Sequence, residues 1–261
     1  MVDFHTHILP GIDDGSRDSE TTKALLCEEK RQGIKLIVAT PHFYANRVSI
    51  ERFLEMRSGA MIKTKKLTEE ADEPLPEIIA GAEVYYFEGI GNASEIGKLC
   101  ISETRTILLE MPFGQWNAGM MKDIEGLIFQ QRLNVVLAHV ERYCFFQKDR
   151  RIWDRIMELP LTPQMNAEGF LRKRKLLRSD RQRQLCFHFL SGHPNIILGS
   201  DCHNMEGRAP NLAAARAEIE TAMGREVLEC IDETTRNALE LHPKQAGETR
   251  RAIGDMLTDT L

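Results

Sequence analysis

The chain has 261 residues, of which 42% are hydrophobic and 28% are charged. This composition is ordinary for a globular protein and excludes collagen, coiled coils and intrinsic disorder. The length suits one large α/β domain as well as two small ones. The 34 Lys and Arg residues against 39 Asp and Glu residues leave a formal charge of −5, which argues against a general binder of nucleic acid or of membrane surfaces.

The sequence shows no segment for crossing a membrane. The longest apolar runs, such as residues 135–138, are far short of the ~20 residues of a membrane span. The N-terminus lacks the basic and apolar regions of a secretory signal. The six cysteines, none in C-x-x-C spacing, favour a reducing compartment. We therefore expect a cytoplasmic protein without a membrane span.

Short apolar segments alternate with stretches of helical character along the chain. Strands are expected at residues 4–9, 36–39, 78–86, 106–111, 135–140, 161–166 and 196–199. Several are apolar throughout, as in strands buried on both faces of a parallel sheet. Helices are expected at residues 19–33, 49–70, 118–132, 149–159, 168–190 and 211–223.

The alternation of strand and helix, repeated about seven times, indicates an α/β barrel or a doubly wound sheet. No Gly/Ser linker or change in composition divides the chain. We therefore expect one catalytic domain over residues 1–261, with the tail after about residue 242 lying at its periphery.

Nearly every expected strand ends in side chains that can bind a metal ion. These residues are His5, His7, Asp14, His42, Glu83, Glu110, His139, Asp201 and His203. In a barrel, the carboxyl ends of the strands open onto one face. Side chains at positions i and i+2 of a strand point the same way, so we expect Asp3, His5 and His7 to share one face, as do Asp201 and His203.

Five histidines and four carboxylates in these positions are improbable by chance, whereas His188, His193 and His242 lie in helical or loop context and are expected to take no part. Imidazole and carboxylate together suit Mn²⁺, Fe²⁺ or Zn²⁺ better than Mg²⁺ or Ca²⁺. Nine ligands exceed what one or two ions usually take, so three ions sharing bridging carboxylates are expected. Such a cluster can turn a bridging water into hydroxide near neutral pH and stabilise an in-line displacement.

The same residues fall into recognisable motifs. They are D-x-H-x-H-x-L-P-G-x-D-D-G at 3–15, T-P-H at 40–42, G-A-E at 81–83, L-E-M-P at 109–112, H-x-E-R-Y at 139–143 and S-D-x-H-N at 200–204. With these motifs the chain resembles the PHP (polymerase and histidinol phosphatase) superfamily and, within it, the CpsB/CapC type of bacterial protein-tyrosine phosphatase. The resemblance covers residue 3 to about 210 and implies a distorted (β/α)7 TIM-like barrel with three metal ions, usually manganese.

The resemblance also implies a role for each residue. The first ion would be held by His5, His7, Glu83 and Asp201, the second by Glu83, Glu110 and His139, and the third by Asp14, His42 and His203. Arg142 and Arg208 match arginines that bind the phosphate, as a guanidinium fork can. His42 or a metal-bound water would supply the little acid help that a tyrosine leaving group needs.

The implied activity is that of a manganese-dependent phosphomonoesterase. Its substrate would be the phosphotyrosine tail of a bacterial tyrosine kinase that regulates capsule or exopolysaccharide synthesis. Three alternatives stay open: a small-molecule phosphatase of the histidinol-phosphate type, a metallohydrolase barrel acting on C–N bonds, and a binding domain with structural metals. The second usually needs a lysine after a middle strand, where this chain has Glu83, Glu110 and His139.

The chain departs from the family pattern at Val140, Phe43 and Cys202, which removes no ligand but affects the expected substrate pocket. The C-x5-R string of cysteine-dependent phosphatases occurs at 144–150 and 202–208, although neither fits a phosphate-binding loop. If Cys202 lies between two ligands, its side chain should point to the opposite side of the strand.

Two further features allow more than one interpretation. The aromatic residues Tyr85, Tyr86, Phe43 and Trp116 lie near strand ends and could wall a pocket for a phosphotyrosine ring or belong to the core. The arginine-rich segment 171–185 could be a solvated helix face, a binding surface for an acidic or phosphorylated tail, or a contact between subunits.

Overall fold

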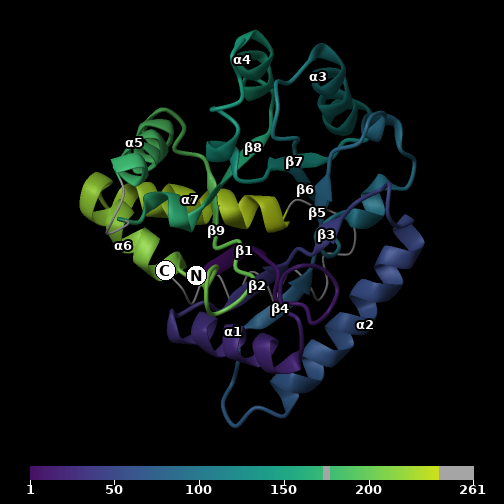
Figure 1. Ribbon diagram of the computed structural model, residues 1–261, viewed down its shortest axis with the longest axis vertical. Helices are drawn as coiled ribbons and strands as arrows, with labels where there is room; N and C mark the ends of the chain where they lie inside the picture. The colour runs from purple at the N-terminus through teal and green to yellow at the C-terminus, as the bar shows by residue number, and fades with distance from the viewer. Residues whose placement is uncertain (173–176, 241–261) are drawn as a thin grey trace.

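Parallel β-strands form the centre of the fold (Figure 1). The computed structural model describes residues 1–172 and 177–240, without the side chains of 177–180 and 240. Within these ranges the strands are β1 (Val2–Thr6), β2 (Leu36–Ala39), β3 (His42–Phe43), β4 (Glu77–Ala80), β5 (Glu83–Tyr85), β6 (Thr106–Glu110), β7 (Asn134–Leu137), β8 (Thr162–Asn166) and β9 (Ile197–Gly199).

The strands close into a barrel with seven positions. Their order is β1-β2-β4 in one sheet and β3-β5-β6-β7-β8-β9 in the other, all parallel. The chain continues from β2 to β3 and from β4 to β5, so each of these pairs fills one position. The first and last positions meet where the Asp201 N–H donates to His5 O (2.8 Å) and the His7 N–H donates to Cys202 O (2.9 Å). The expected seven-stranded α/β barrel is confirmed.

Two of the seven strand positions are interrupted, one between β2 and β3 and the other between β4 and β5. Pro41, which has no N–H to donate, separates β2 from β3, and residues 81–82 separate β4 from β5. A Cβ at Gly81 would lie 3.1 Å from the Ile101 side chain, so this break lies in tightly packed surroundings. Because β4 ends at Ala80 and β5 begins at Glu83, the expectation of one continuous strand over residues 78–86 was wrong.

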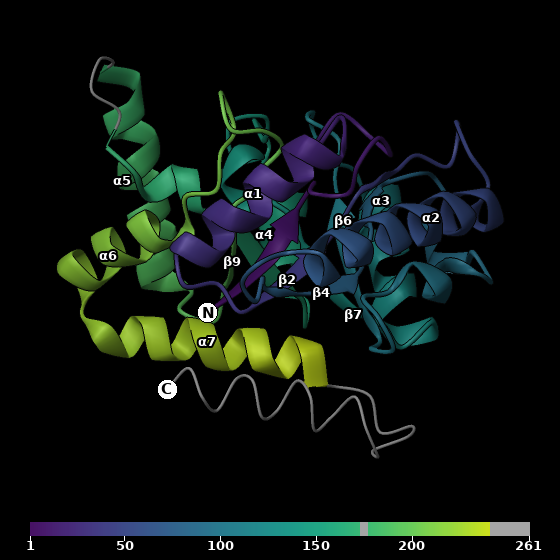
Figure 2. The same cartoon turned by 90° about the horizontal axis from the view of Figure 1, so that it is seen from below.

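Helices surround the strands (Figures 1 and 2). They are α1 (Ser19–Arg31), α2 (Ile50–Glu69), α3 (Ala118–Glu125), α4 (Arg151–Met157), α5 (Leu177–Gly192), α6 (Leu212–Met223) and α7 (Arg225–Glu240). Asp18 caps α1 by accepting the Thr21 N–H (2.8 Å). The helix expected over 118–132 continues beyond α3 as a π-helical segment, Gly126–Gln130, and the one expected over 168–190 begins as a separate 3₁₀ turn, Ala167–Phe170.

The buried apolar residues form two clusters. The larger lies between the strands and the helices, and the smaller fills the barrel, with Phe4, Leu108 and Val136 among its members. Ala238 and Leu239 of α7 belong to this inner cluster. The Thr106 hydroxyl at the start of β6 donates to Ala238 O (2.5 Å), so α7 covers the amino ends of the strands (Figure 2).

Helix α7 was not expected from the sequence. No helix in residues 1–172 and 177–240 is both long and apolar enough to cross a membrane. The expected peripheral tail after residue 242, together with His242, lies outside the described residues.

Candidate metal centre

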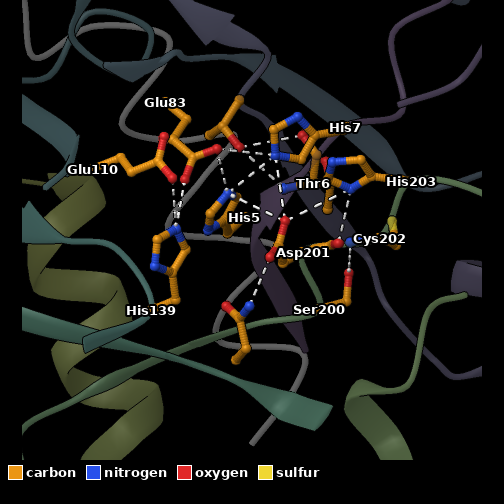
Figure 3. Close-up of polar contacts among 12 residues, drawn as sticks. His5, Thr6, His7, Glu83, Glu110, His139, Ser200, Asp201, Cys202 and His203 are labelled. Carbon is orange, nitrogen blue, oxygen red and sulfur yellow. Dashed lines mark hydrogen bonds and ion pairs between the residues drawn. The ribbon is translucent and has the colours of Figure 1, made fainter. Parts of the chain in front are cut away.

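The side chains expected to bind metal converge at the carboxyl ends of the strands. His5 comes from β1 and His7 follows it, His42 and Glu83 begin β3 and β5, and Glu110 ends β6. The remaining residues lie in the segments that follow a strand, and they are Asp14, His139, Asp201 and His203. Figure 3 shows most of these side chains turned toward one another. The barrel thus brings together residues up to 198 positions apart in the chain (203 − 5 = 198).

The first group of side chains surrounds the Nε2 atoms of His5 and His7, which lie 3.2 Å apart. Glu83 Oε2 lies 3.2 Å from each of these two nitrogens. Asp201 Oδ1 lies 3.7 Å from His5 Nε2 and 3.4 Å from His7 Nε2. These four donors enclose a space in which one ion could be held.

The second group lies on the other side of Glu83. Its Oε1 atom is 2.9 Å from His139 Nε2, which is 3.5 Å from Glu110 Oε1. The two oxygens of Glu83 therefore face two different groups of ligands, as a bridging carboxylate does.

The third group contains Asp14, His42 and His203. Asp14 Oδ1 lies 3.5 Å from the Nε2 atoms of both histidines. A nitrogen of His7 also lies within 4.8 Å of these atoms. The other ring nitrogen of His42 lies 3.0 Å from Glu83 Oε2 and 3.8 Å from Glu110 Oε2, so His42 lies between the second and third groups.

Several buried polar atoms in the centre are left without a hydrogen bond. Within the described residues, Glu83 Oε2, Glu110 Oε2 and His42 Nδ1 have no hydrogen-bond partner. A buried polar atom without a partner costs roughly 1–3 kcal/mol. Because all three are good metal donors and face one another, the donor set fits bound divalent cations.

The protonation of these groups reflects their close packing. Burial would lower the pKa of His7, but the carboxylates of Asp13, Asp201 and Glu83 raise it well above its usual value. Burial would likewise raise the pKa of Glu83, but His5, His139 and His7 lower it well below its usual value. The centre is therefore a set of charged carboxylates that attracts cations, protons included.

Asp13 was not assigned a role from the sequence, although it holds two of the site histidines. Its Oδ2 atom accepts from His7 Nδ1 (2.8 Å) and from the His42 N–H (3.0 Å), and Oδ1 accepts from the Gly15 N–H (2.9 Å). Bonding at Nδ1 leaves the Nε2 lone pair of His7 for a metal ion.

Gln164 and Asn166 of β8 were also missed. Gln164 Oε1 lies 3.0 Å from His5 Nδ1 and accepts the His139 N–H (2.8 Å). The Gln164 amide donates to Asn166 Oδ1 (2.9 Å), and the Asn166 amide donates to Asp201 Oδ2 (2.7 Å). The two amides thus connect ligands of the first two groups. The i, i+2 spacing of these two buried polar residues was the available signal.

Two of the candidate ligands have a left-handed backbone. His139 has φ 31° and Asp201 has φ 54°, a conformation that costs about 1–2 kcal/mol in residues other than glycine. Each lies two residues after the end of a strand, β7 for His139 and β9 for Asp201. Such strain is concentrated at functional sites.

Asp3 does not join the cluster, contrary to expectation. Its Oδ1 atom accepts from the Ser200 N–H (2.9 Å), and the carboxyl lies beside Glu29 of α1. The pairing of β1 with β2 is irregular between Asp3 and Thr6, so Asp3 and His5 do not share a face as they would in a regular strand.

The two arginines expected at the site both reach Asp201. Arg142 Nη2 lies 3.0 Å and Arg208 Nη2 lies 2.5 Å from Asp201 Oδ2. Arg208 Nη1 also lies 2.8 Å from His203 Nε2. Two guanidinium groups therefore lie at the edge of the metal centre, where they could bind an anion.

The cysteine alternative does not fit the structure. Cys202 is fully buried and its thiol points to Glu29 Oε1 (3.6 Å), away from the cluster, as expected. Burial and the neighbouring carboxylates raise its pKa well above the usual value. Burial also raises the pKa of Cys144. A thiolate nucleophile is disfavoured at both positions.

Of the four aromatic residues expected near the site, only Tyr85 lies there: it pairs with the candidate ligand Glu110 in the sheet, and its ring is 5.5 Å from that of Tyr44, which lies beside His42. Phe43 and Trp116 are core residues, and the Tyr86 hydroxyl donates to Asp123 (2.8 Å). The ring of Phe113, 45% exposed, instead lies nearly parallel to that of His139, with 5.8 Å between their centres. Beside it, Phe146 is also exposed.

Of the other histidines, the two within the described residues lie apart from this cluster. His188 and His193 are exposed on or just after α5. The arginine-rich segment 171–185 lies partly outside the described residues. Within its described part, Arg172 and Arg183 pair with Glu218 of α6 (3.7 and 2.7 Å).

A family model described as capsular polysaccharide synthesis, CpsB/CapC, matches residues 1–241. The chain belongs to this family. It is 27% identical over 233 residues to the tyrosine-protein phosphatase CpsB of Streptococcus agalactiae, covering 87% of this chain and 92% of that protein. It is 29% identical over 234 residues to the tyrosine-protein phosphatase YwqE of Bacillus subtilis, covering 87% of each chain.

Solved structures agree on the fold. A structure from work on YwqE of Bacillus subtilis and CpsB of Streptococcus pneumoniae, described as metal-dependent tyrosine phosphatases, superposes with a TM-score of 0.75 at 24% identity, covering 94% of this chain and 96% of the other. A lactonase from Listeria monocytogenes gives a TM-score of 0.53 at 11% identity, covering 94% and 95%. The chain thus shares its barrel fold with both of these structures.

Proposed function

We propose that this protein is a metal-dependent phosphatase that removes phosphate from phosphotyrosine in a protein. The observation that carries the proposal is the convergence of nine metal-binding side chains with two arginines at one barrel mouth. Membership of the CpsB/CapC family, and the tyrosine phosphatase names of the relatives, support this reaction and this substrate class.

The three groups of side chains would hold three divalent ions. His5, His7, Glu83 and Asp201 would bind the first, Glu83, Glu110 and His139 the second, and Asp14, His42 and His203 the third. The mixture of imidazoles and carboxylates favours Mn²⁺, with Fe²⁺ or Zn²⁺ as the other candidates. When bound, such ions supply a nucleophilic water at neutral pH and offset negative charge on the transferring group.

Arg142 and Arg208 would bind the phosphoryl oxygens. Both guanidinium groups contact Oδ2 of Asp201, the carboxylate oxygen that does not face His5 and His7. A guanidinium presents two parallel N–H donors to a phosphate. The arginines would thus orient the phosphate and stabilise the charge that develops during transfer, which is the main requirement of this reaction.

His42 is better suited to metal binding than to proton donation. Burial lowers its pKa below the usual value, which favours the neutral imidazole that a metal requires. Tyrosine is a tolerable leaving group, so the proton that it needs can also come from water. Donation of a proton by His42 to the leaving tyrosine is a secondary role in this proposal.

The substrate ring would lie against Phe113. This side chain is exposed, and its ring is stacked on that of the candidate ligand His139. Aromatic pairs add about 0.5–1.5 kcal/mol beyond the burial of their surface. An aromatic surface beside the metal centre favours a substrate with a ring, such as phosphotyrosine, over phosphates without one.

The family description places its members in capsular polysaccharide synthesis. We infer that the substrate is the phosphotyrosine tail of a tyrosine kinase that regulates capsule or exopolysaccharide synthesis. The six free cysteines suit a protein that acts in a reducing cytoplasm, where such a tail would have to be exposed.

A comparison of two variants with the wild type tests this function. Metal content and release of phosphate from a phosphotyrosine peptide would be measured together for the wild type, His5→Ala and Arg142→Ala. We expect His5→Ala to lose both metal and activity, and Arg142→Ala to keep its metal but lose activity by about 100-fold or more, since one removed charge stabiliser costs this much. Full activity of His5→Ala would refute the proposal, and faster turnover of histidinol phosphate would reassign the substrate.

A further inference from the structure

A pocket opens beside the metal centre, between the barrel mouth and helix α5. It has a volume of about 460 Å³ and is lined by Arg142, Phe145, Arg181 and Gln182. Arg142 is shared with the candidate phosphate site, where it contacts Asp201. The pocket therefore begins where the phosphate site ends, and its far wall is the helix that carries the arginine-rich segment.

Positive charge lines this pocket on two sides. Two arginines of α5 differ in their partners. Arg183 forms an ion pair with Glu218 and also donates to Phe170 O. In contrast, no carboxylate of the described residues pairs with Arg181, which is exposed. A guanidinium without an acidic partner, facing a cavity that a second arginine also lines, favours an anionic group in that cavity.

Phe145 supplies the apolar part of the wall. Its side chain is 56% exposed, and it follows the segment Val140–Arg142 by three residues. An acidic side chain has a short apolar stem and a charged end, so it can pack against an aromatic ring while its carboxylate meets the arginines. The pocket matches this combination better than it matches a purely apolar or a purely charged side chain.

The pocket adjoins the proposed phosphate site, because Arg142 belongs to both. An extended chain advances about 3.3–3.6 Å per residue, so a residue next to phosphotyrosine reaches a neighbouring pocket while the phosphate occupies its own site. Resting on the proposed phosphatase activity, we propose that the pocket between Arg142 and Arg181 binds an acidic side chain flanking the phosphotyrosine of the substrate.

The test compares two phosphotyrosine peptides with the metal-loaded full-length protein. One peptide has glutamates beside the phosphotyrosine, and the other has glutamines in the same positions. We expect kcat/KM of the wild type to favour the glutamate peptide by about twofold to fivefold, as for an exposed ion pair, and the preference to shrink at high salt.

The variant Arg181→Gln should lower the ratio of the two kcat/KM values to about one. The ratio is the readout, because any loss of overall activity cancels from it. Arg181→Glu should disfavour the glutamate peptide and favour a lysine-flanked one. Arg225→Gln is the matched control: Arg225 is an exposed arginine on α7, at the other end of the barrel, and this variant should keep the wild-type ratio.

The possible results distinguish a failure of the proposed pocket from a failure of the proposed phosphatase activity. Equal turnover of both peptides by the wild type, or an unchanged preference in Arg181→Gln, would overturn the pocket while leaving the phosphatase activity in place. Failure of the metal-loaded protein to hydrolyse either peptide would overturn the proposed function itself.

Discussion

Among the single residues, Asp13 shows how the protein prepares its ligands before any ion arrives. One oxygen of its carboxylate accepts from both the His7 ring and the His42 backbone. Gln164 acts similarly on His5 and on the backbone of His139. Hydrogen bonds of this kind fix the ring orientation and the tautomer, so that the correct nitrogen faces the metal.

The variant Asp13→Ala should weaken metal binding by about 10- to 100-fold, because His7 loses the acceptor that fixes its tautomer. The affinity would be measured by titrating chelator-treated protein with Mn²⁺. Asp72→Asn serves as the control, because Asp72 is exposed and lies in the turn after α2. Equal Mn²⁺ affinity of Asp13→Ala and the wild type would contradict the role of Asp13.

The pKa of His139 leads to a prediction about the metal-free protein. Burial would lower this pKa, but Glu110 and Glu83 raise it to about 9, against about 6.5 in the unfolded chain. Between these values the folded state holds a proton that the unfolded state lacks. The resulting stabilisation is therefore complete below about pH 6.5 and is lost as the pH rises through about 9.

We expect the free energy of unfolding of the chelated protein to fall by about 1–3 kcal/mol between pH 7 and pH 9. Urea denaturation at each pH would measure it. The fall should be smaller in His139→Gln and in Mn²⁺-loaded protein, because a metal-bound histidine is already deprotonated. A stability of the chelated wild type that rises over this range would contradict the assigned shift.

The candidate ligands could be predicted from the sequence because each lies in an expected strand or within five residues after one. Asp13, Gln164 and Asn166 were missed, because the i, i+2 spacing places the last two on one face of a strand without indicating what they contact, and aspartate is common in turns for other reasons. Their role depends on which ligand side chain lies within 3.0 Å of them, and only the folded chain determines that distance.

Among the elements, helix α7 explains how the barrel is closed at the end away from the site. Its residues Ala238 and Leu239 reach into the barrel core, and Thr106 of β6 holds the last turn. The sequence does carry a signal for this helix, because its buried apolar residues recur at helical spacing and only position 235 on that face is a threonine. The buried Thr235, whose hydroxyl donates to Ile231 O within the helix (2.8 Å), shows why such residues fit its inner face.

Removing one apolar side chain from this helix should destabilise the fold without changing the reaction. Leu239→Ala should lower the free energy of unfolding by about 2–5 kcal/mol, the usual cost of a buried leucine. Asn237→Ala, at an exposed neighbouring position, should change it by less than about 1 kcal/mol. Chemical denaturation would measure both, and equal stabilities of the two variants would refute the role of α7.

The broken strands show the limit of pattern analysis at this scale. Residues 78–86 read as one apolar strand, yet the chain separates β4 from β5 at Gly81 and Ala82. The break puts Glu83 at the start of a new strand, paired with His42 of β3. Tertiary packing, which a local pattern does not contain, decides where such a strand is interrupted.

For the whole molecule, the seven alternations of strand and helix in the sequence predicted the α/β class. They did not predict that the sheet closes into a barrel. Closure depends on pairing between residues nearly 200 positions apart, as in the bridge between Thr6 and Cys202. This contact brings His5 and His7 to Asp201 and His203. The same contact therefore completes both the barrel and the metal centre.

The central claim is that metal ions in this centre are required for the removal of phosphate from phosphotyrosine. The most direct measurement is phosphate release from a phosphotyrosine peptide by chelated protein as Mn²⁺ is added back, with the bound metal counted in the same samples. We expect no release without metal, and recovery as the bound metal approaches about three ions per chain. Undiminished release by protein shown to contain no metal would contradict the account.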